Sequence, residues 1–239
     1  MRRKQQIPII YEDEYILVCE KPAGMPVQSD HSRDMDVETA IKHQLYEKQQ
    51  GEEEPYLTAV HRLDRPVGGL MVFARTKEAA AALSEQIQKH EFEKCYQAVV
   101  CGALPDDFGT FEDYLLRDGK TNTSSVVKKG TKGAKKAILD YEMIDEIETK
   151  EGVLSWVLIM LETGRHHQIR VQMSHAGMPL AGDHKYGKMD AVDNVALCAH
   201  KIAFRHPVTG KNMKFEIRPQ GIVFQPFLQK KNKKEETLS

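Results

Sequence analysis

Short apolar runs separated by polar turns make up most of this chain, and their pattern predicts a fold rich in β-strands. Apolar runs at residues 7–11 and 15–19 flank the acidic segment Glu12-Asp13-Glu14, which predicts a β-hairpin. Further runs of strand length predict strands at residues 70–74, 95–101, 138–147, 153–161 and 213–217.

Helical spacing is confined to a few segments. Residues 37–49 and 169–176 predict two helices, and Thr76 can cap a third that extends to about His90. Residues 106–137 are rich in Gly, Lys, Thr and Asp, which predicts loops and short edge strands. Because strands occur in runs with few helices between them, we expect an α+β fold with a mixed or antiparallel sheet.

Composition narrows the class of protein. The chain has 239 residues, of which 41% are hydrophobic and 29% charged, as is typical of a globular protein. No apolar run reaches the roughly 18 residues that a membrane helix needs, and the basic N-terminus leads into no signal-type stretch. We therefore expect a cytoplasmic protein.

Charge is unevenly distributed along the chain. The formal net charge is −1, which argues mildly against a nucleic-acid-binding protein. Five lysines nevertheless fall within nine residues, and they fit either phosphate contacts or a solvated loop: Lys128, Lys129, Lys132, Lys135 and Lys136.

The common motifs for cofactors and metals are missing. Gly119-Lys120-Thr121 resembles the end of a phosphate-binding loop, but Tyr114 stands where the first glycine would be. The four cysteines form no Cys-x-x-Cys pair, and no metalloprotease or serine-hydrolase signature occurs. We expect neither a cofactor nor a metal.

One candidate for catalysis is an aspartate between two arginines. Asp64 lies in the segment His61-Arg62-Leu63-Asp64-Arg65, just before Pro66 and a pair of glycines. Nearby arginines stabilise the ionised form of a carboxylate, and glycines permit close approach of a ligand. This chemistry fits a catalytic carboxylate and a structural salt bridge equally well.

A second candidate segment follows the most apolar predicted strand. It reads Thr163-Gly164-Arg165-His166-His167-Gln168-Ile169-Arg170, and Arg165 could clamp a carboxylate or phosphate through two parallel hydrogen bonds. The two adjacent histidines would point to opposite faces of a strand, which favours surface or hydrogen-bonding roles over metal binding.

Together these segments resemble the RluA-type family of pseudouridine synthases. The resemblance covers nearly the whole chain in the right order, over residues 20–27, 61–65, 93–98, 163–187 and 197–207. The chain departs from the family pattern at two places. It has Val67-Gly68-Gly69-Leu70 where the family usually has Thr-Ser-Gly-Leu, and Leu197-Cys198-Ala199 where Leu-His-Ala is common.

The resemblance implies an isomerase that breaks the N1–C1′ bond of a uridine in RNA and rejoins the base through C5. Asp64 would act at the sugar, as nucleophile or as base, and Arg165 would keep it ionised. Tyr96 would stack on the uracil, Leu197 would pack against it, and Arg62 would fill the space that the flipped base leaves. Gln168 is expected among the substrate-binding residues. The reaction involves no net redox change and consumes no energy, which agrees with the expected absence of a cofactor.

The same resemblance implies the pseudouridine synthase fold, with an active-site cleft across its sheet. We expect residues 1–239 to form one catalytic domain without an S4 domain, with flexible tails at 1–6 and 230–239. The expected partner is a stem-loop of ribosomal or transfer RNA, bound by a monomer without an obligate protein partner. The main alternatives are an RNA-binding factor without catalysis and a glycoside-type hydrolase, with a distant residue such as Asp183 as the second carboxylate.

Overall fold

The computed structural model describes residues 6–29, 32, 34–48, 50, 54–187 and 194–230. By the density of its contacts the chain divides into two compact units. The first comprises residues 1–94 and 199–217, and the second comprises residues 95–198 and 218–239. The chain changes from one unit to the other within a strand on two occasions, in β5 (Glu93–Cys101) and in β10 (Leu197–Arg205).

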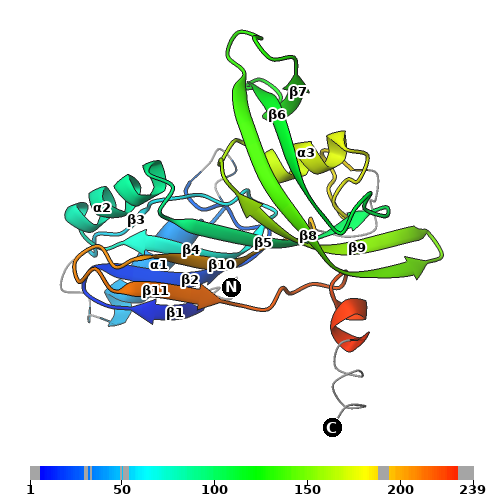
Figure 1. Ribbon diagram of the computed structural model, residues 1–239. Coiled ribbons are helices and arrows are strands. Elements are labelled where there is room, and N and C mark those ends of the chain that lie inside the picture. Colours follow the sequence, from blue (N-terminus) through cyan, green and yellow to red (C-terminus); the bar gives the residue numbers. More distant parts are fainter. Residues whose placement is uncertain are drawn as a thin grey trace. The chain divides into compact units, whose positions relative to one another are not determined.

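The first unit is a sheet with helices beside it (Figure 1). Its strands follow the order β1-β2-β4-β10, with β11 paired to β10 and β3 paired to β4. The pairs β1–β2, β2–β4, β3–β4 and β10–β11 are antiparallel. The elements are β1 (Ile9–Glu12), β2 (Ile16–Lys21), α1 (Val37–Lys48), β3 (Thr58–Ala59), β4 (Gly68–Ala74), α2 (Lys77–Gln88) and β11 (Asn212–Glu216).

The core of the first unit forms where α2 packs on β2 and β4. Ala79 and Leu83 of α2 are fully buried against Val18 and Val72 of these strands. Phe92 and Phe204 extend this core with stacked rings whose centroids lie 5.2 Å apart. The strands β2 and β4, which lead to the candidate site, are therefore held in place by a well-packed apolar layer.

The second unit is an antiparallel sheet in the order β5-β9-β8-β6-β7. Its further elements are β6 (Phe108–Asp118), β7 (Thr123–Val127), β8 (Lys135–Thr149), β9 (Gly152–Leu161) and α3 (Gln168–His175). Val171 of α3 packs with Leu115 of β6 and Ala137 of β8, and Figure 1 shows α3 beside the β6–β7 hairpin. Trp156, Phe224 and Phe227 form a separate core cluster.

Most predicted elements are confirmed to within a few residues. Thr76 caps α2, since its side chain accepts a hydrogen bond of 3.1 Å from the Ala79 amide. The prediction of loops and short edge strands for residues 106–137 is confirmed for β7, a strand of five residues at the edge of the sheet, but was wrong for β6, a strand of 11 residues. Exposed residues alternate with half-buried ones along the first half of β6, which is the pattern of a strand. The prediction relied on the polar composition of the segment and overlooked this alternation. The strand β10 was not predicted either.

The predicted tails lie mostly outside the described residues, as 1–5 and 231–239 do. Lys230 is described, and it lies in a helical stretch of which residues 225–230 are described. Its ammonium group lies 2.6 Å from the Asp145 carboxylate. Among the described residues no helix is both long enough and apolar enough to cross a membrane.

Candidate active site

Asp64 lies on a tight turn just before β4. The amide of Val67 donates a hydrogen bond of 3.0 Å to the carbonyl of Asp64, which closes the turn. The apolar side chains of Leu63 and Val67 on either side are buried, whereas Asp64 is half-buried. The turn is therefore anchored by its apolar residues, and the carboxylate remains at the surface of the first unit.

The side chain of Lys21 holds this turn by hydrogen bonds to its main chain. It ends β2, is 1% exposed, and donates hydrogen bonds to three carbonyls. These belong to Val67 at 2.7 Å, Pro22 at 2.9 Å and Arg65 at 3.1 Å. An ammonium group has three N–H donors, so the three acceptors match its capacity. Lys21 thereby ties the end of β2 to both sides of the Asp64 turn.

Lys21 is also a positive charge in the electrostatic field of Asp64. Burial lowers the pKa of Lys21 to about 7, and the negative charge of Asp64 opposes this shift. The cations expected near Asp64 from the sequence were arginines, and Lys21 was not predicted. The available signal was a charged residue at the end of an apolar strand, directly before Pro22-Ala23-Gly24, where only a specific set of partners would permit its burial.

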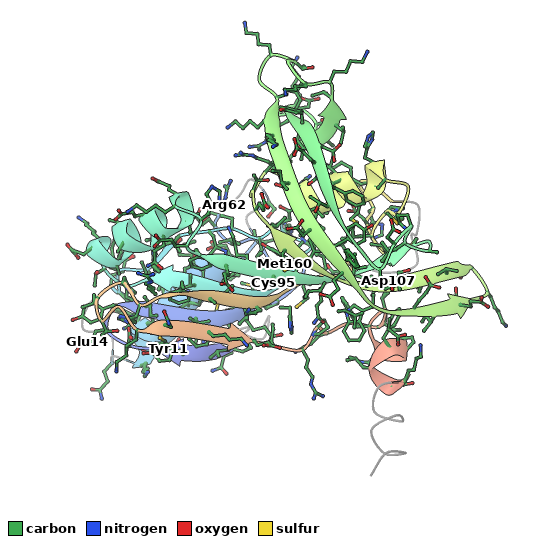
Figure 2. All side chains as sticks on the ribbon, in the orientation of Figure 1. Tyr11, Glu14, Arg62, Cys95, Asp107 and Met160 are labelled. Carbon is green, nitrogen blue, oxygen red and sulfur yellow. The ribbon has the colours of Figure 1, made fainter. Side chains whose placement is uncertain are left out.

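The arginines that flank Asp64 differ in environment. Arg62 is exposed, and Figure 2 shows its side chain at the surface. Arg65 donates hydrogen bonds to the loop after β2, namely to the Gly24 carbonyl and the Ser32 hydroxyl, each at 3.0 Å, and it forms an ion pair with Asp34. Arg65 therefore connects the Asp64 turn to this loop.

His61 is a structural member of the same segment. Its Nε2 accepts a hydrogen bond of 3.2 Å from the Val72 amide, and its ring lies 5.5 Å from that of Phe92. Burial, assisted by the charge of Lys94, lowers the pKa of His61 to about 3. The imidazole is therefore neutral at physiological pH and fixes the turn to β4 rather than exchanging protons.

Backbone geometry explains why the Val67-Gly68-Gly69 departure is tolerated. Lys21 bonds the carbonyl of Val67, which any residue provides. Gly69 has φ of +122°, and an added Cβ would lie 2.5 Å from the backbone N and O atoms of Ala199. Glycine is therefore required at 69 because no side chain fits. At 68 an added Cβ would meet the Lys21 carbonyl at 3.3 Å, so that site is tight as well.

In the second unit, Arg165 lies on the turn between β9 and α3. Its side chain is exposed, and its Nε donates a hydrogen bond of 2.8 Å to the Lys136 carbonyl on β8. Gln168 supports the turn, because its Oε1 accepts bonds from the Arg165 amide at 2.9 Å and from the Thr163 hydroxyl at 2.8 Å. Its Nε2 donates to the Ile138 carbonyl at 3.0 Å.

These bonds give Gln168, 3% exposed, a role in shaping the turn that carries Arg165. A contact between Gln168 and substrate stays a prediction. Tyr96 lies in β5 opposite Ile159 of β9 and is 7% exposed, and Leu197 begins β10 and is 6% exposed. Asp64 and Arg62 thus belong to the first unit, and the other four predicted site residues belong to the second.

The adjacent histidines of the second unit are not on a strand, so the prediction that they point to opposite faces was wrong. His167 has left-handed backbone geometry at φ 55°, and the rings of His166 and His167 stack with centroids 3.7 Å apart. His166 bonds Ser124 at 2.9 Å and Asn122 at 3.1 Å, and His167 bonds Tyr186 at 2.7 Å. The pair ties the β6–β7 hairpin to α3.

Asp183 is unsuited to serve as the second carboxylate of a hydrolase. Its two oxygens accept bonds of 2.7 Å each from Arg170, and Oδ1 also accepts bonds from the amides of Lys185 and Tyr186. The carboxylate side chain is fully buried. Burial acts to raise the pKa of Asp183, but the bonds from Arg170 and the amides outweigh it and lower this pKa. Asp183 therefore has a structural role.

Comparisons with known proteins identify the family to which this chain belongs. The family described as RNA pseudouridylate synthase matches residues 15–175, a span that contains Asp64, Tyr96 and Arg165. The chain is 34% identical to the ribosomal large subunit pseudouridine synthase D of Pseudomonas aeruginosa over 227 residues, covering 88% of this chain and 68% of that protein. It is 31% identical to the tRNA pseudouridine synthase C of Yersinia pestis, covering 89% and 86%.

The chain therefore belongs to the RNA pseudouridylate synthase family, a family of isomerases that act on RNA. It spans 57% of another relative, the ribosomal large subunit pseudouridine synthase D of Neisseria meningitidis serogroup B, so its coverage of relatives varies. The solved structure of human RNA pseudouridylate synthase domain containing 1 matches with a TM-score of 0.74 at 20% sequence identity. The match covers 91% of this chain and 85% of the human chain. The predicted family and fold class are confirmed.

Proposed function

We propose that this chain isomerises specific uridines of ribosomal or transfer RNA to pseudouridine, with Asp64 as the catalytic carboxylate. The observation that carries this proposal is the construction of the Asp64 turn. A half-buried carboxylate stands on a turn that a buried ammonium group fixes through three hydrogen bonds. Rigid support of this kind is what a reacting group needs in order to meet its target atom in one geometry.

The names of the relatives support the substrate class. Those with substrates in their names are synthases for the large ribosomal subunit or for tRNA. We assign the whole of residues 1–239 to one catalytic domain that works in the cytoplasm. The protein would act as a monomer.

In the proposed reaction the carboxylate of Asp64 acts at C1′ of the target uridine while the N1–C1′ bond breaks. The uracil leaves with the electron pair of the broken bond, rotates, and C5 bonds to C1′. The proton on C5 is then lost and N1 takes up a proton, so the product is an isomer of uridine. Arg165 would hold the Asp64 carboxylate, Tyr96 would stack on the uracil, and Leu197 would pack against the base. Gln168 would act chiefly by shaping the Arg165 turn.

Access to the base requires that the uridine leave its stack, at a cost of a few kcal/mol. The exposed Arg62, two residues before Asp64, is the side chain that we assign to the vacated space. A guanidinium can stack on the neighbouring bases and bond phosphates at the same time. Loss of Arg62 should therefore weaken productive RNA binding more than it disturbs the fold.

The proposal is tested by mapping pseudouridine in total RNA from cells with and without the gene, then treating the deficient RNA with purified protein. We expect at least one position to lose pseudouridine in the deficient cells and to regain it in vitro. Free uracil is measured in the same reaction, because a hydrolase would release it and an isomerase would not. Release of uracil, or failure to restore any position, would contradict the proposal.

A further inference from the structure

We propose that Arg65 is a positioning residue for Asp64, because it couples the placement of the catalytic turn to the loop that follows β2. This inference rests on the proposed role of Asp64. Arg65 follows Asp64 directly in the chain, and both its main chain and its side chain bond residues of the segment 21–34. No role was assigned to Arg65 from the sequence beyond its charge.

The main chain of Arg65 forms the first part of this link. Its carbonyl accepts a hydrogen bond of 2.8 Å from the Gly24 amide and another of 3.1 Å from the Lys21 ammonium. Gly24 has φ of 83°, in the left-handed region that favours glycine, so the loop turns sharply where it meets Arg65. The peptide that follows Asp64 is thereby joined to the first residues of the loop.

The side chain forms the second part. The guanidinium bonds the Gly24 carbonyl through Nε and the Ser32 hydroxyl through Nη1, both at 3.0 Å, and bonds the Asp34 carboxylate through Nη2. All three nitrogens are thus engaged by residues up to 41 positions away in sequence. A planar guanidinium with three engaged nitrogens has little freedom to rotate, and this limits the movement of the main chain behind it.

The far end of the loop is fixed independently. The carboxylate of Asp36 accepts bonds from the Thr39 amide at 2.9 Å and the Thr39 hydroxyl at 2.8 Å at the start of α1, and from the Ser29 hydroxyl at 3.1 Å. The loop is therefore anchored to β2 at one end and α1 at the other, and Arg65 connects its middle to the Asp64 turn. A displacement of Ser32 or Asp34 would be transmitted to Asp64 through Arg65.

The exposure of the Arg65 and Asp34 side chains distinguishes a positioning role of Arg65 from a role in the stability of the fold. The side chains of Arg65 and Asp34 are 42% and 44% exposed. Ion pairs at this exposure contribute little to the stability of a fold. Geometry at a reacting carboxylate is far more demanding, since a misplacement of about 1 Å can reduce a rate by about 100-fold. The link should therefore affect turnover without a comparable effect on unfolding.

The test compares Arg65→Met with the double variant Ser32→Ala/Asp34→Ala and with the triple variant that combines them. Lys89→Met is the matched control, because it breaks an exposed ion pair with Glu85 on α2. For each, kcat and KM on the target RNA and the urea midpoint of unfolding are measured. We expect Arg65→Met and the double variant each to lower kcat by about tenfold or more while KM changes by less than about threefold, since a misplacement of about 1 Å can reduce a rate by about 100-fold. The triple variant should lose no more than Arg65→Met alone, because all three side chains act through one link.

Two results would overturn the inference alone: a raised KM with unchanged kcat in Arg65→Met, which would make Arg65 an RNA contact, or normal kcat in the double variant. If Arg65→Met unfolds, Arg65→Lys retains the charge without the three-nitrogen fork, and its kcat must still fall below that of the control. Wild-type protein that makes no pseudouridine on any RNA would overturn the proposed function, and the positioning role with it.

Discussion

Replacing Lys21 by methionine removes a buried ammonium group while keeping an unbranched side chain. The change leaves the carbonyls of Pro22 and Val67 without the donor that the lysine provides, whereas the Arg65 carbonyl retains its bond from the Gly24 amide. A buried polar group that loses its partner costs about 1–3 kcal/mol, so we expect the free energy of unfolding to fall by about 1–3 kcal/mol or more at neutral pH, mainly through the buried Val67 carbonyl, because the bond to Pro22 is only part-buried. Lys89→Met, at an exposed ion pair, should leave the free energy of unfolding almost unchanged.

The pH dependence of this difference tests the electrostatics of the site. The pKa of Lys21 is lowered from 10.5 to about 7 in the folded chain. Between these values the unfolded state binds more protons than the folded state, so this group makes the wild-type protein more stable as pH rises. The methionine variant lacks this contribution. The stability gap between the two proteins should therefore widen above pH 7, by up to about 1.4 kcal/mol per pH unit.

Urea unfolding of both proteins at pH 6, 7, 8 and 9 measures the gap directly, and contributions from other residues cancel in the difference. We expect a constant gap below pH 7 and a widening gap above it. A gap that stays constant up to pH 9 would refute the reasoning, because it would mean that the three carbonyls keep the proton on Lys21 at its ordinary affinity. A Lys21→Met protein as stable as wild type at pH 7 would refute the structural role itself.

Further predictions concern three other parts of the fold. The imidazole of His61, whose pKa is lowered to about 3, should show constant NMR chemical shifts from pH 5 to pH 8, and a titration within that range would contradict its burial. Gly69→Ala should destabilise the protein by about 3 kcal/mol or more in urea unfolding, since its Cβ would overlap the neighbouring backbone, whereas Gly119→Ala, with open space around it, should change stability by less than about 0.5 kcal/mol. Equal effects would disprove the packing argument. Arg170→Met should cost about 3–5 kcal/mol by leaving a buried carboxylate unpaired, and Arg170→Met/Asp183→Leu should recover part of that loss in the same assay.

The sequence predicted the fold well where the apolar pattern was regular. The hairpin of β1 and β2, the helix α2 with its Thr76 cap, and the pair β8–β9 all follow from local periodicity. It failed for β6, where composition was weighed above the alternation of side chains. It also failed for β10, whose pattern has no polar alternation at its start because Leu197, Cys198 and Ala199 are all buried.

The candidate site was predicted only in part, and the reason is physical. Asp64 and Arg165 stand in segments dense in polar residues, and the order of these segments along the chain resembles a known family, so the sequence could single them out. Local chemistry alone fitted a structural salt bridge at Asp64 equally well. Lys21 and Arg65 act through carbonyls and through residues up to 46 positions away, and no local pattern reports such contacts. Asp183 was a plausible catalytic carboxylate by residue type, and only its burial against Arg170 revealed the structural role.

The central claim is that Asp64 performs the chemistry, and the Asp64→Asn variant tests it most directly. Pseudouridine formation is measured on the target RNA at saturating protein in a single turnover, together with RNA affinity and urea unfolding. We expect no detectable pseudouridine from Asp64→Asn, with RNA affinity within about threefold of wild type, which corresponds to less than about 1 kcal/mol. Pseudouridine formation by Asp64→Asn at the wild-type rate would show that Asp64 is not the catalytic carboxylate.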